Sequence, residues 1–194
     1  MDLGLKGKCA FVAGASKGLG FATALQLAHE GVNVAVCART ESTLHEAADK
    51  IRAETDVEVL VLSGDVRNNS NLDSIFDRIT DDWHRLDVLV TNAGGPPAGT
   101  LDEIDPEQYR GATELNLQST VEMVYRALPL MRKHHWGRII AITSVSVKQP
   151  IDNLILSNTS RAGVVAFCKT VANQVGRDGI TVNVICPGNF RTQR

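Results

Sequence analysis

The residues with the clearest chemical potential form a glycine-rich turn near the start of the chain. An apolar run, 9–13, leads into a segment with three glycines, 14–20, and a helical pattern follows. Such a turn lets backbone N–H groups face open space with no Cβ in the way. The helix dipole adds partial positive charge, so the turn can bind a phosphate. The spacing Gly-x-x-x-Gly-x-Gly alone is weak evidence, because a glycine turn can also serve only close packing.

Two cations occur where a phosphorylated ribose would be recognised. Lys17 belongs to the glycine turn, and Arg39 follows the second apolar run. An acidic residue after that run would accept hydrogen bonds from a ribose 2′-hydroxyl, and this chain has none there. Two cations suit a 2′-phosphate, which favours NADP(H) over NAD(H). The alternative is that both are solvated surface cations.

Small and polar residues follow the third and fourth apolar runs. Asp65, next to Val66, could accept a hydrogen bond from an adenine amino group, or could cap the following turn. Asn92, Ala93 and Gly94 come after the fourth run. Their small size lets the backbone approach a ligand closely, while Asn92 can also bond to neighbouring strand ends.

The segments that must position these residues alternate between short apolar runs and amphipathic runs. We expect strands over 9–13, 32–37, 57–62, 86–91, 138–143 and 180–185, and helices over 19–30, 41–54, 71–82 and 154–175, with a long helix from Pro106 to a stop at Gly137. The apolar runs have no polar face, which indicates a parallel sheet covered by helices on both faces. This alternation predicts a single doubly wound α/β domain over 1–194, a Rossmann fold with its ligand at the carboxyl ends of the strands.

Composition sets the broad class. The chain has 194 residues, of which 43% are hydrophobic and 22% charged, with a net charge of −2. These values are ordinary for one globular domain, and they argue against nucleic acid or a membrane as a partner. The four cysteines lie far apart without a C-x-x-C pair. We therefore expect a reducing, cytoplasmic setting and no metal.

Together these motifs resemble the short-chain dehydrogenase/reductase family, in particular its 3-oxoacyl-acyl-carrier-protein reductase-like branch. The matching residues run in order along nearly the whole chain: 14–20, Asp65-Val66, Asn92-Ala93-Gly94, Asn116, Thr143-Ser144, and Pro187-Gly188 with Thr192. The resemblance implies an NADP(H)-dependent oxidoreductase. Its substrate would be a carbonyl compound, a 3-oxoacyl thioester or another ketone, reduced to an alcohol or formed by the reverse reaction.

The resemblance also assigns roles to individual residues. The pyrophosphate and ribose would be wrapped by Gly14, Ser16, Lys17, Gly18, Leu19 and Gly20. Adenine would contact Asp65 and Val66, the adjacent ribose Asn92, Ala93 and Gly94, and the nicotinamide Pro187, Gly188 and Thr192. Ser144 would bind the substrate carbonyl, and Asn116 would kink its helix and hold a water of a proton relay. The alternatives are a turn cap for Ser144 and a solvent-facing polar residue for Asn116.

The chain departs from the family at the proton-transferring pair. The resemblance implies a Tyr thirteen residues after the serine and a Lys four residues later, and Ser157 and Arg161 occupy those positions. A serine is a much weaker acid than a tyrosine. Arginine can still bond ribose hydroxyls but cannot exchange protons near neutral pH. The alternative function is therefore a non-catalytic NADP(H)-binding protein, either a sensor or an assembly subunit.

Two further expectations follow from the resemblance. The family continues with a substrate-covering segment and another strand, so we expect a fragment of a longer protein or a chain without that lid. The last strand would then lie at an exposed edge, unless a partner or the missing segment covers it. A homodimer or homotetramer is expected through the helix of Asn116 and the helix after Ser157. The apolar residues of the second helix, for the sheet or for a partner, are Val164, Val165, Phe167, Val171 and Val175.

Overall fold

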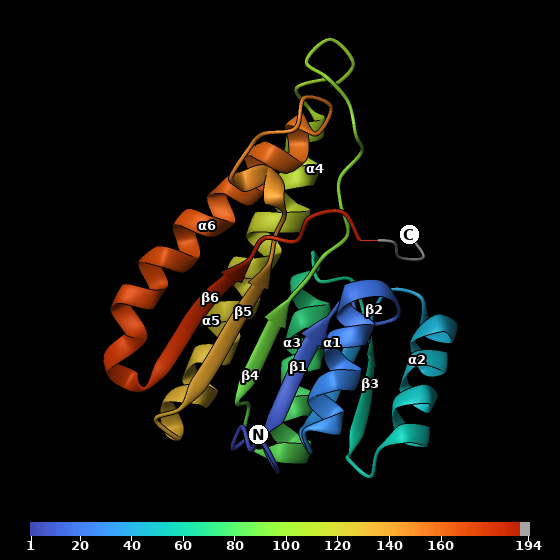
Figure 1. The fold of residues 1–194 in the computed structure, drawn as a ribbon, viewed down its shortest axis with the longest axis vertical. Coiled ribbons are helices and arrows are strands. Elements are labelled where there is room, and N and C mark those ends of the chain that lie inside the picture. Colours follow the sequence, from blue (N-terminus) through green and yellow to red (C-terminus); the bar gives the residue numbers. More distant parts are fainter. Residues whose placement is uncertain (191–194) are drawn as a thin grey trace.

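The computed structural model describes residues 1–190, in which six parallel strands form one sheet (Figure 1). The strands are β1 (Cys9–Ala13), β2 (Asn33–Ala38), β3 (Val59–Ser63), β4 (Val88–Thr91), β5 (Gly137–Ile142) and β6 (Ile180–Ile185). Their order in the sheet is β3-β2-β1-β4-β5-β6. The chain thus winds from β1 to one edge, returns to β4 and proceeds to the other edge. This is the predicted doubly wound Rossmann-like fold, with a topological switch point between β1 and β4.

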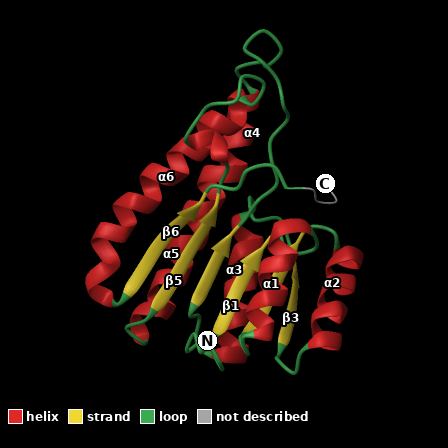
Figure 2. Ribbon diagram, in the orientation of Figure 1, coloured by secondary structure: helices red, strands yellow, loops and turns green. Residues whose placement is uncertain are grey.

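Helices lie on both faces of the sheet (Figure 2). They are α1 (Gly18–His29), α2 (Glu41–Glu54), α3 (Asn69–Trp83), α4 (Gln108–Thr113), α5 (Ser119–Lys133) and α6 (Ile155–Val175). A π-helical turn, η1 (Glu114–Gln118), and two 3₁₀ turns, η2 (Val145–Val147) and η3 (Gly176–Asp178), complete the elements. Within residues 1–190 no helix has the length and apolar character needed to cross a membrane, and no group of three His, Cys, Asp or Glu side chains is placed to hold a metal.

Two apolar layers explain why the strand sequences have no polar face. Val12 and Val36 belong to the layer under α1 and α2, whereas their neighbours along the strands face the layer under α3, α5 and α6. In that second layer Phe11 of β1 meets Phe76 of α3 edge to face, with 5.4 Å between the ring centroids. The central strands are therefore buried on both sides, as the sequence predicted.

The edge strand β6 is the exception to this burial. It was expected to be apolar throughout, but Thr181, Asn183 and Ile185 are exposed, and Ile185 is 50% accessible. Val182, between them, belongs to the core layer under α3, α5 and α6. An edge strand with one covered face shows the alternation of a half-buried strand. Within residues 1–190 this strand is the last of the sheet, next to β5, and its exposure as an edge stays a prediction.

The predicted continuous helix over 106–137 is also corrected. The chain forms α4, then η1, then α5, and the helical structure begins two residues after Pro106. The first turn is closed by the side chain of Gln108, whose Oε1 accepts a hydrogen bond from the Asp105 N–H at 2.9 Å. The other predicted elements agree with the structure within two residues at each end.

Candidate functional site

A cavity of about 960 Å³ opens at the carboxyl ends of the strands. It spans the switch point between β1 and β4, where ligands of open α/β sheets bind, and its volume suits a large cofactor. Sixteen of the predicted site residues line it: Gly14, Ser16, Lys17, Gly18, Leu19, Arg39, Asp65, Val66, Asn92, Ala93, Gly94, Ser144, Ser157, Arg161, Pro187 and Gly188. Gly20 and Asn116 lie outside the wall, and Thr192 lies outside the described residues.

The glycine turn requires its glycines for two different reasons. Gly14 and Gly18 have φ angles of +62° and +61°, in the left-handed region that favours glycine. Gly20 is needed for space, because a Cβ there would fall on the carbonyl oxygen of Gly14. Asn92 holds the turn from β4, since its Nδ2 donates to the Gly14 carbonyl at 3.3 Å. Gly20 therefore shapes the turn, and the strand-bridging role considered for Asn92 is observed.

Three cations gather at the end of the cavity next to β2 and β3. Lys17 and Arg39 were predicted there, and Arg67 is an addition. Arg67 forms an ion pair with Asp65, with 2.6 Å between Nη2 and Oδ2. Its hydrogen bonds lower the pKa of the Asp65 carboxyl more than partial burial raises it. The sequence signal for Arg67 was its place directly after Asp65-Val66 at the end of β3, the position type at which the other site residues occur.

Ser144 occupies the opposite end of the cavity, after β5. It is the N-cap of η2, and its Oγ accepts a hydrogen bond from the Ser146 N–H at 3.1 Å. The turn-cap interpretation is thus correct for one lone pair of the hydroxyl. The hydroxyl hydrogen can still be donated to a ligand, because Ser144 also lines the cavity. Ser157 lies in the same wall and is 8% exposed.

Arg161 bridges the ends of two strands. It is 8% exposed, and its Nη1 donates to the Ile142 carbonyl of β5 at 3.1 Å. Its Nη2 donates to the carbonyls of Gly94 and Ala93, in the loop after β4, at 3.2 and 3.5 Å. The guanidinium therefore joins α6, β5 and the β4 loop at the wall of the cavity. Sequence reasoning considered it only as a ligand for a ribose.

Asn116 lies in η1, so the helix is indeed irregular at this residue. The side chain is buried, which excludes the solvent-facing alternative. Its Nδ2 donates to Ser160 Oγ of α6 at 3.1 Å and to the Ala112 carbonyl at 3.3 Å. Its Oδ1 is buried with no hydrogen-bond partner within residues 1–190, an environment in which buried water is common. A π-helical turn with such a group often marks a functional site, and the water relay stays a prediction.

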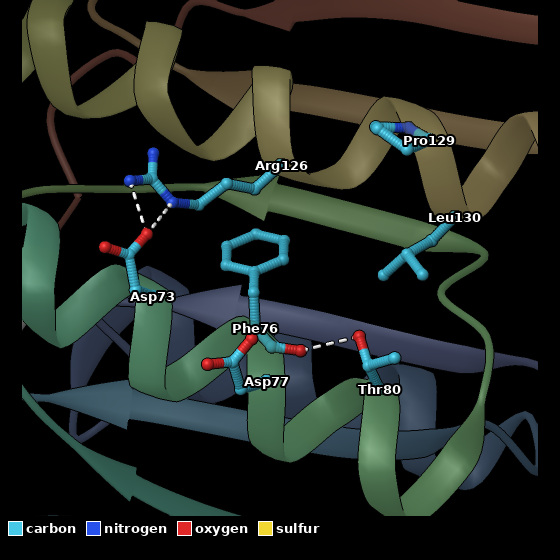
Figure 3. A pocket seen from close by; sticks show the side chains of 7 residues that line it. All are labelled: Asp73, Phe76, Asp77, Thr80, Arg126, Pro129 and Leu130. Atoms are coloured by element: carbon cyan, nitrogen blue, oxygen red, sulfur yellow. Dashed lines mark hydrogen bonds and ion pairs between the residues drawn. The ribbon is translucent and has the colours of Figure 1, made fainter.

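A smaller hollow of about 210 Å³ lies between α3 and α5, away from the strand ends. Figure 3 shows Phe76 between the two helices, with an ion pair of Arg126 and Asp73 beside it, 2.7 Å long. Thr80 donates to the Phe76 carbonyl of its own helix at 2.7 Å. The hollow is a gap in helix packing whose cation is already neutralised, so the candidate site is the larger cavity.

One family model matches nearly the whole chain. The model described as short chain dehydrogenase matches residues 8–194. The chain belongs to the short-chain dehydrogenase/reductase family. Members of this family are NAD(P)-dependent oxidoreductases, and the resemblance inferred from the motifs is confirmed.

Individual short-chain dehydrogenase/reductase proteins are also similar to this chain in sequence and structure. A 3-oxoacyl-[acyl-carrier-protein] reductase of Synechocystis is 36% identical over 191 residues, which cover 97% of this chain and 76% of the reductase. The crystal structure of L-sorbose reductase from Gluconobacter frateurii, complexed with NADPH and L-sorbose, superposes with a TM-score of 0.96 at 33% identity, over 100% of this chain and 73% of that one. Actinorhodin polyketide ketoreductase with NADPH has a TM-score of 0.91 at 34% identity, over 96% and 72%.

Proposed function

We propose that this chain binds NADP(H) in the cavity and transfers hydride between the cofactor and a carbonyl/alcohol pair, either a 3-oxoacyl thioester or another ketone. The observation that carries the proposal is that one cavity contains both the glycine turn and Ser144. The turn offers backbone N–H groups at the start of α1 for a pyrophosphate. The names of the similar proteins, a 3-oxoacyl reductase and NADPH-bound reductases, support the same substrate and cofactor classes.

The preference for NADP(H) rests on two cations. Lys17 and Arg39 line the cavity from the glycine turn and from the residue after β2, and both are exposed toward it. No carboxylate follows β2 directly to accept from a ribose 2′-hydroxyl. A 2′-phosphate between the two cations would gain charge-assisted hydrogen bonds, whereas NADH offers no group for them.

At the reacting end, the bound cofactor would supply the hydride and the protein would orient the carbonyl. Ser144 would donate its hydroxyl hydrogen to the carbonyl oxygen, while its Oγ stays fixed by the Ser146 N–H. Arg161 would keep the β4 loop and the end of β5 in register through its carbonyl contacts. Ser157 cannot deliver a proton as a tyrosine does, so the alkoxide formed by hydride transfer would take its proton from water, and we expect slow turnover.

Titration with both cofactors tests this proposal. We expect NADPH to bind at least about tenfold more tightly than NADH, because a charge-assisted hydrogen bond contributes about 1.5–3 kcal/mol. Lys17→Ala and Arg39→Ala should each reduce that ratio, and Lys50→Ala, an exposed lysine of α2 outside the cavity wall, serves as control. NADPH consumption is then followed with ketones and 3-oxoacyl thioesters. Equal binding of the two cofactors would contradict the NADP(H) assignment.

Ser157 and Arg161, in place of the family's Tyr and Lys, favour a second candidate function, a cofactor-binding protein without catalysis. A serine hydroxyl is a weak acid and an arginine stays charged near neutral pH, so Ser157 and Arg161 are poor proton donors, and both are largely buried in the cavity wall. Such a protein would serve as a sensor or as an assembly subunit. Tight binding of NADPH without consumption above the cofactor blank would favour this candidate over the reductase.

We further propose that residues 1–194 act as one dinucleotide-binding domain and that it assembles into a homodimer or homotetramer. All six strands belong to one sheet, which supports a single domain. On α6, Val164, Val171 and Val175 are buried against the sheet, while Val165 and Phe167 are half-buried. Phe167 also packs against the core layer, so Val165 is the residue of this set that we propose for contact with a partner. Sedimentation of the purified protein measures the assembly state.

A further inference from the structure

The carboxylate of Asp65 is held by the residue two positions later. Nε of Arg67 donates to both oxygens of Asp65 at 3.1 Å, and Nη2 donates to Oδ2 at 2.6 Å. The Arg67 backbone N–H adds a bond to Oδ1 at 3.0 Å. The turn itself is anchored, because the Asp65 N–H donates to Asn71 Oδ1 of α3 at 2.9 Å. These bonds fix the plane of the guanidinium in the wall of the cavity.

The position of this pair distinguishes it from an ordinary surface ion pair. Asp65 and Arg67 both line the cavity, at the end where Lys17 and Arg39 lie. Their side chains are 26% and 41% exposed, so each presents part of its surface to a ligand. The hydrogen bonds from Arg67, aided by the charge of Arg39, keep the pKa of Asp65 below its ordinary value. The carboxylate therefore stays ionised and the guanidinium stays clamped at neutral pH.

A clamped guanidinium can serve a nucleotide as a charge for a phosphate or as a flat face for a base. The negative charge of Asp65 offsets the positive charge of Arg67, and Nε and Nη2 of Arg67 already donate to that carboxylate. Lys17 and Arg39, which the cavity also contains, have no such carboxylate contact within residues 1–190 and are the better phosphate ligands. The faces of the Arg67 plane remain for contact, and guanidinium planes stack on aromatic rings.

We propose that Arg67 is an adenine-binding residue whose guanidinium, oriented by Asp65, stacks on the adenine ring of the dinucleotide. This inference rests on the proposed function, namely that the cavity binds NADP(H). Each Asp65 oxygen already accepts two hydrogen bonds from Arg67, so the role of Asp65 is to orient the guanidinium against one face of the base.

Binding titrations with three ligands test the stacking. The ligands are NADPH, NADH and reduced nicotinamide mononucleotide, which has no adenine. Stacking predicts that Arg67→Ala weakens NADPH and NADH by the same factor, roughly two- to thirty-fold, and leaves the mononucleotide unchanged. Arg67→Lys keeps the charge and loses the plane, so it should resemble Arg67→Ala. Arg39→Ala is the matched control, because it should weaken NADPH far more than NADH.

Each other outcome has a definite meaning. Loss of NADPH affinity alone in Arg67→Ala would assign Arg67 to the 2′-phosphate and overturn the proposal, as would wild-type affinity in Arg67→Lys. Unchanged affinity for both dinucleotides would reduce the pair to a surface ion pair and also overturn it. Failure of the unaltered protein to bind either dinucleotide would instead refute the proposed function. Arg67→Met, which keeps the length of the side chain, carries the test if Arg67→Ala does not fold.

Discussion

Arg161 holds together the rim of the cavity through its guanidinium. A guanidinium has more donors than an ammonium and a rigid fork. Arg161 uses that fork on the carbonyls of Ile142 and Gly94, which end two neighbouring strand segments. The residue at this position is thus a clamp for the rim of the cavity. Because an arginine stays charged near neutral pH, Arg161 is not expected to take part in a proton relay.

The first prediction concerns this pair. Ser157 is buried yet lines the cavity, so a larger side chain has room to extend from α6. We expect Ser157→Tyr combined with Arg161→Lys to raise kcat for ketone reduction by about a hundredfold or more, because a positioned general acid contributes that much. Steady-state rates with NADPH measure it. Ser157→Phe with Arg161→Lys is the control, and equal rates for the Tyr and Phe variants would contradict the proton-donor interpretation.

At the scale of elements, the turn between β1 and α1 depends on close packing with β4. Gly14, Gly20 and Asn92 meet there, and the Asn92 side chain lies 2.8 Å from the Cβ position of either glycine. The loop after β4 has the opposite character at Gly94, where a Cβ would meet nothing within 4 Å. We therefore expect substitution by alanine to affect stability at Gly20 but not at Gly94.

The second prediction follows from this contrast. Gly20→Ala should lower the free energy of unfolding by about 1–3 kcal/mol or more, since the new methyl overlaps the Gly14 carbonyl. Gly94→Ala should leave stability unchanged but weaken NADPH binding, because Gly94 lines the cavity. Urea unfolding and cofactor titration separate the two effects. A stable Gly20→Ala protein would refute the packing argument, and unchanged NADPH affinity in Gly94→Ala would place the cofactor away from that loop.

At the scale of the whole molecule, the amino ends of the central strands are joined by one buried carboxylate. Asp87 is 0% exposed, and it accepts from the Cys9 N–H at 2.9 Å and from Arg85 at 2.8 and 2.9 Å. Lys8 lies 3.7 Å away and also lies over the ring of Trp136, as does Arg138. The candidate site lies at the carboxyl ends of the strands, so we expect this opposite edge to serve stability.

The third prediction tests whether Asp87, at the amino ends of the strands, stabilises the fold. Asp87→Ala should lower the free energy of unfolding by about 3 kcal/mol, the lower end for breaking a buried pair, because Lys8 and Arg85 are partly exposed. Asp178→Ala removes the ion-pair partner of Arg132. Because Asp178 is more exposed than Asp87, this substitution should have an effect several times smaller. Urea unfolding of the apoprotein measures both. Equal effects of the two substitutions would show that burial of Asp87 adds nothing to the fold.

Several features were predictable because they depend on local patterns. β1 and α2 agree with the prediction to the residue, since an apolar run and a 3.6-residue period need only the neighbouring sequence. The clamp of Arg67 on Asp65 is equally local, but a lone Arg after a strand has no distinctive pattern. The π-helical turn at Asn116 was not predictable in detail, because its side chain is directed toward Ser160, 44 residues away.

The sequence by itself determined the doubly wound class and the glycine turn, and it predicted the cations for a 2′-phosphate and the replacement of the catalytic pair. Residue types and short-range periodicity are sufficient for those conclusions. Only the tertiary structure decided that Asn92 supports the glycine turn 78 residues away and that Arg161 clamps the β4 loop 68 residues away. Such contacts arise when the sheet brings distant strand ends to one edge, and no pattern along the chain encodes which donors meet which carbonyls there.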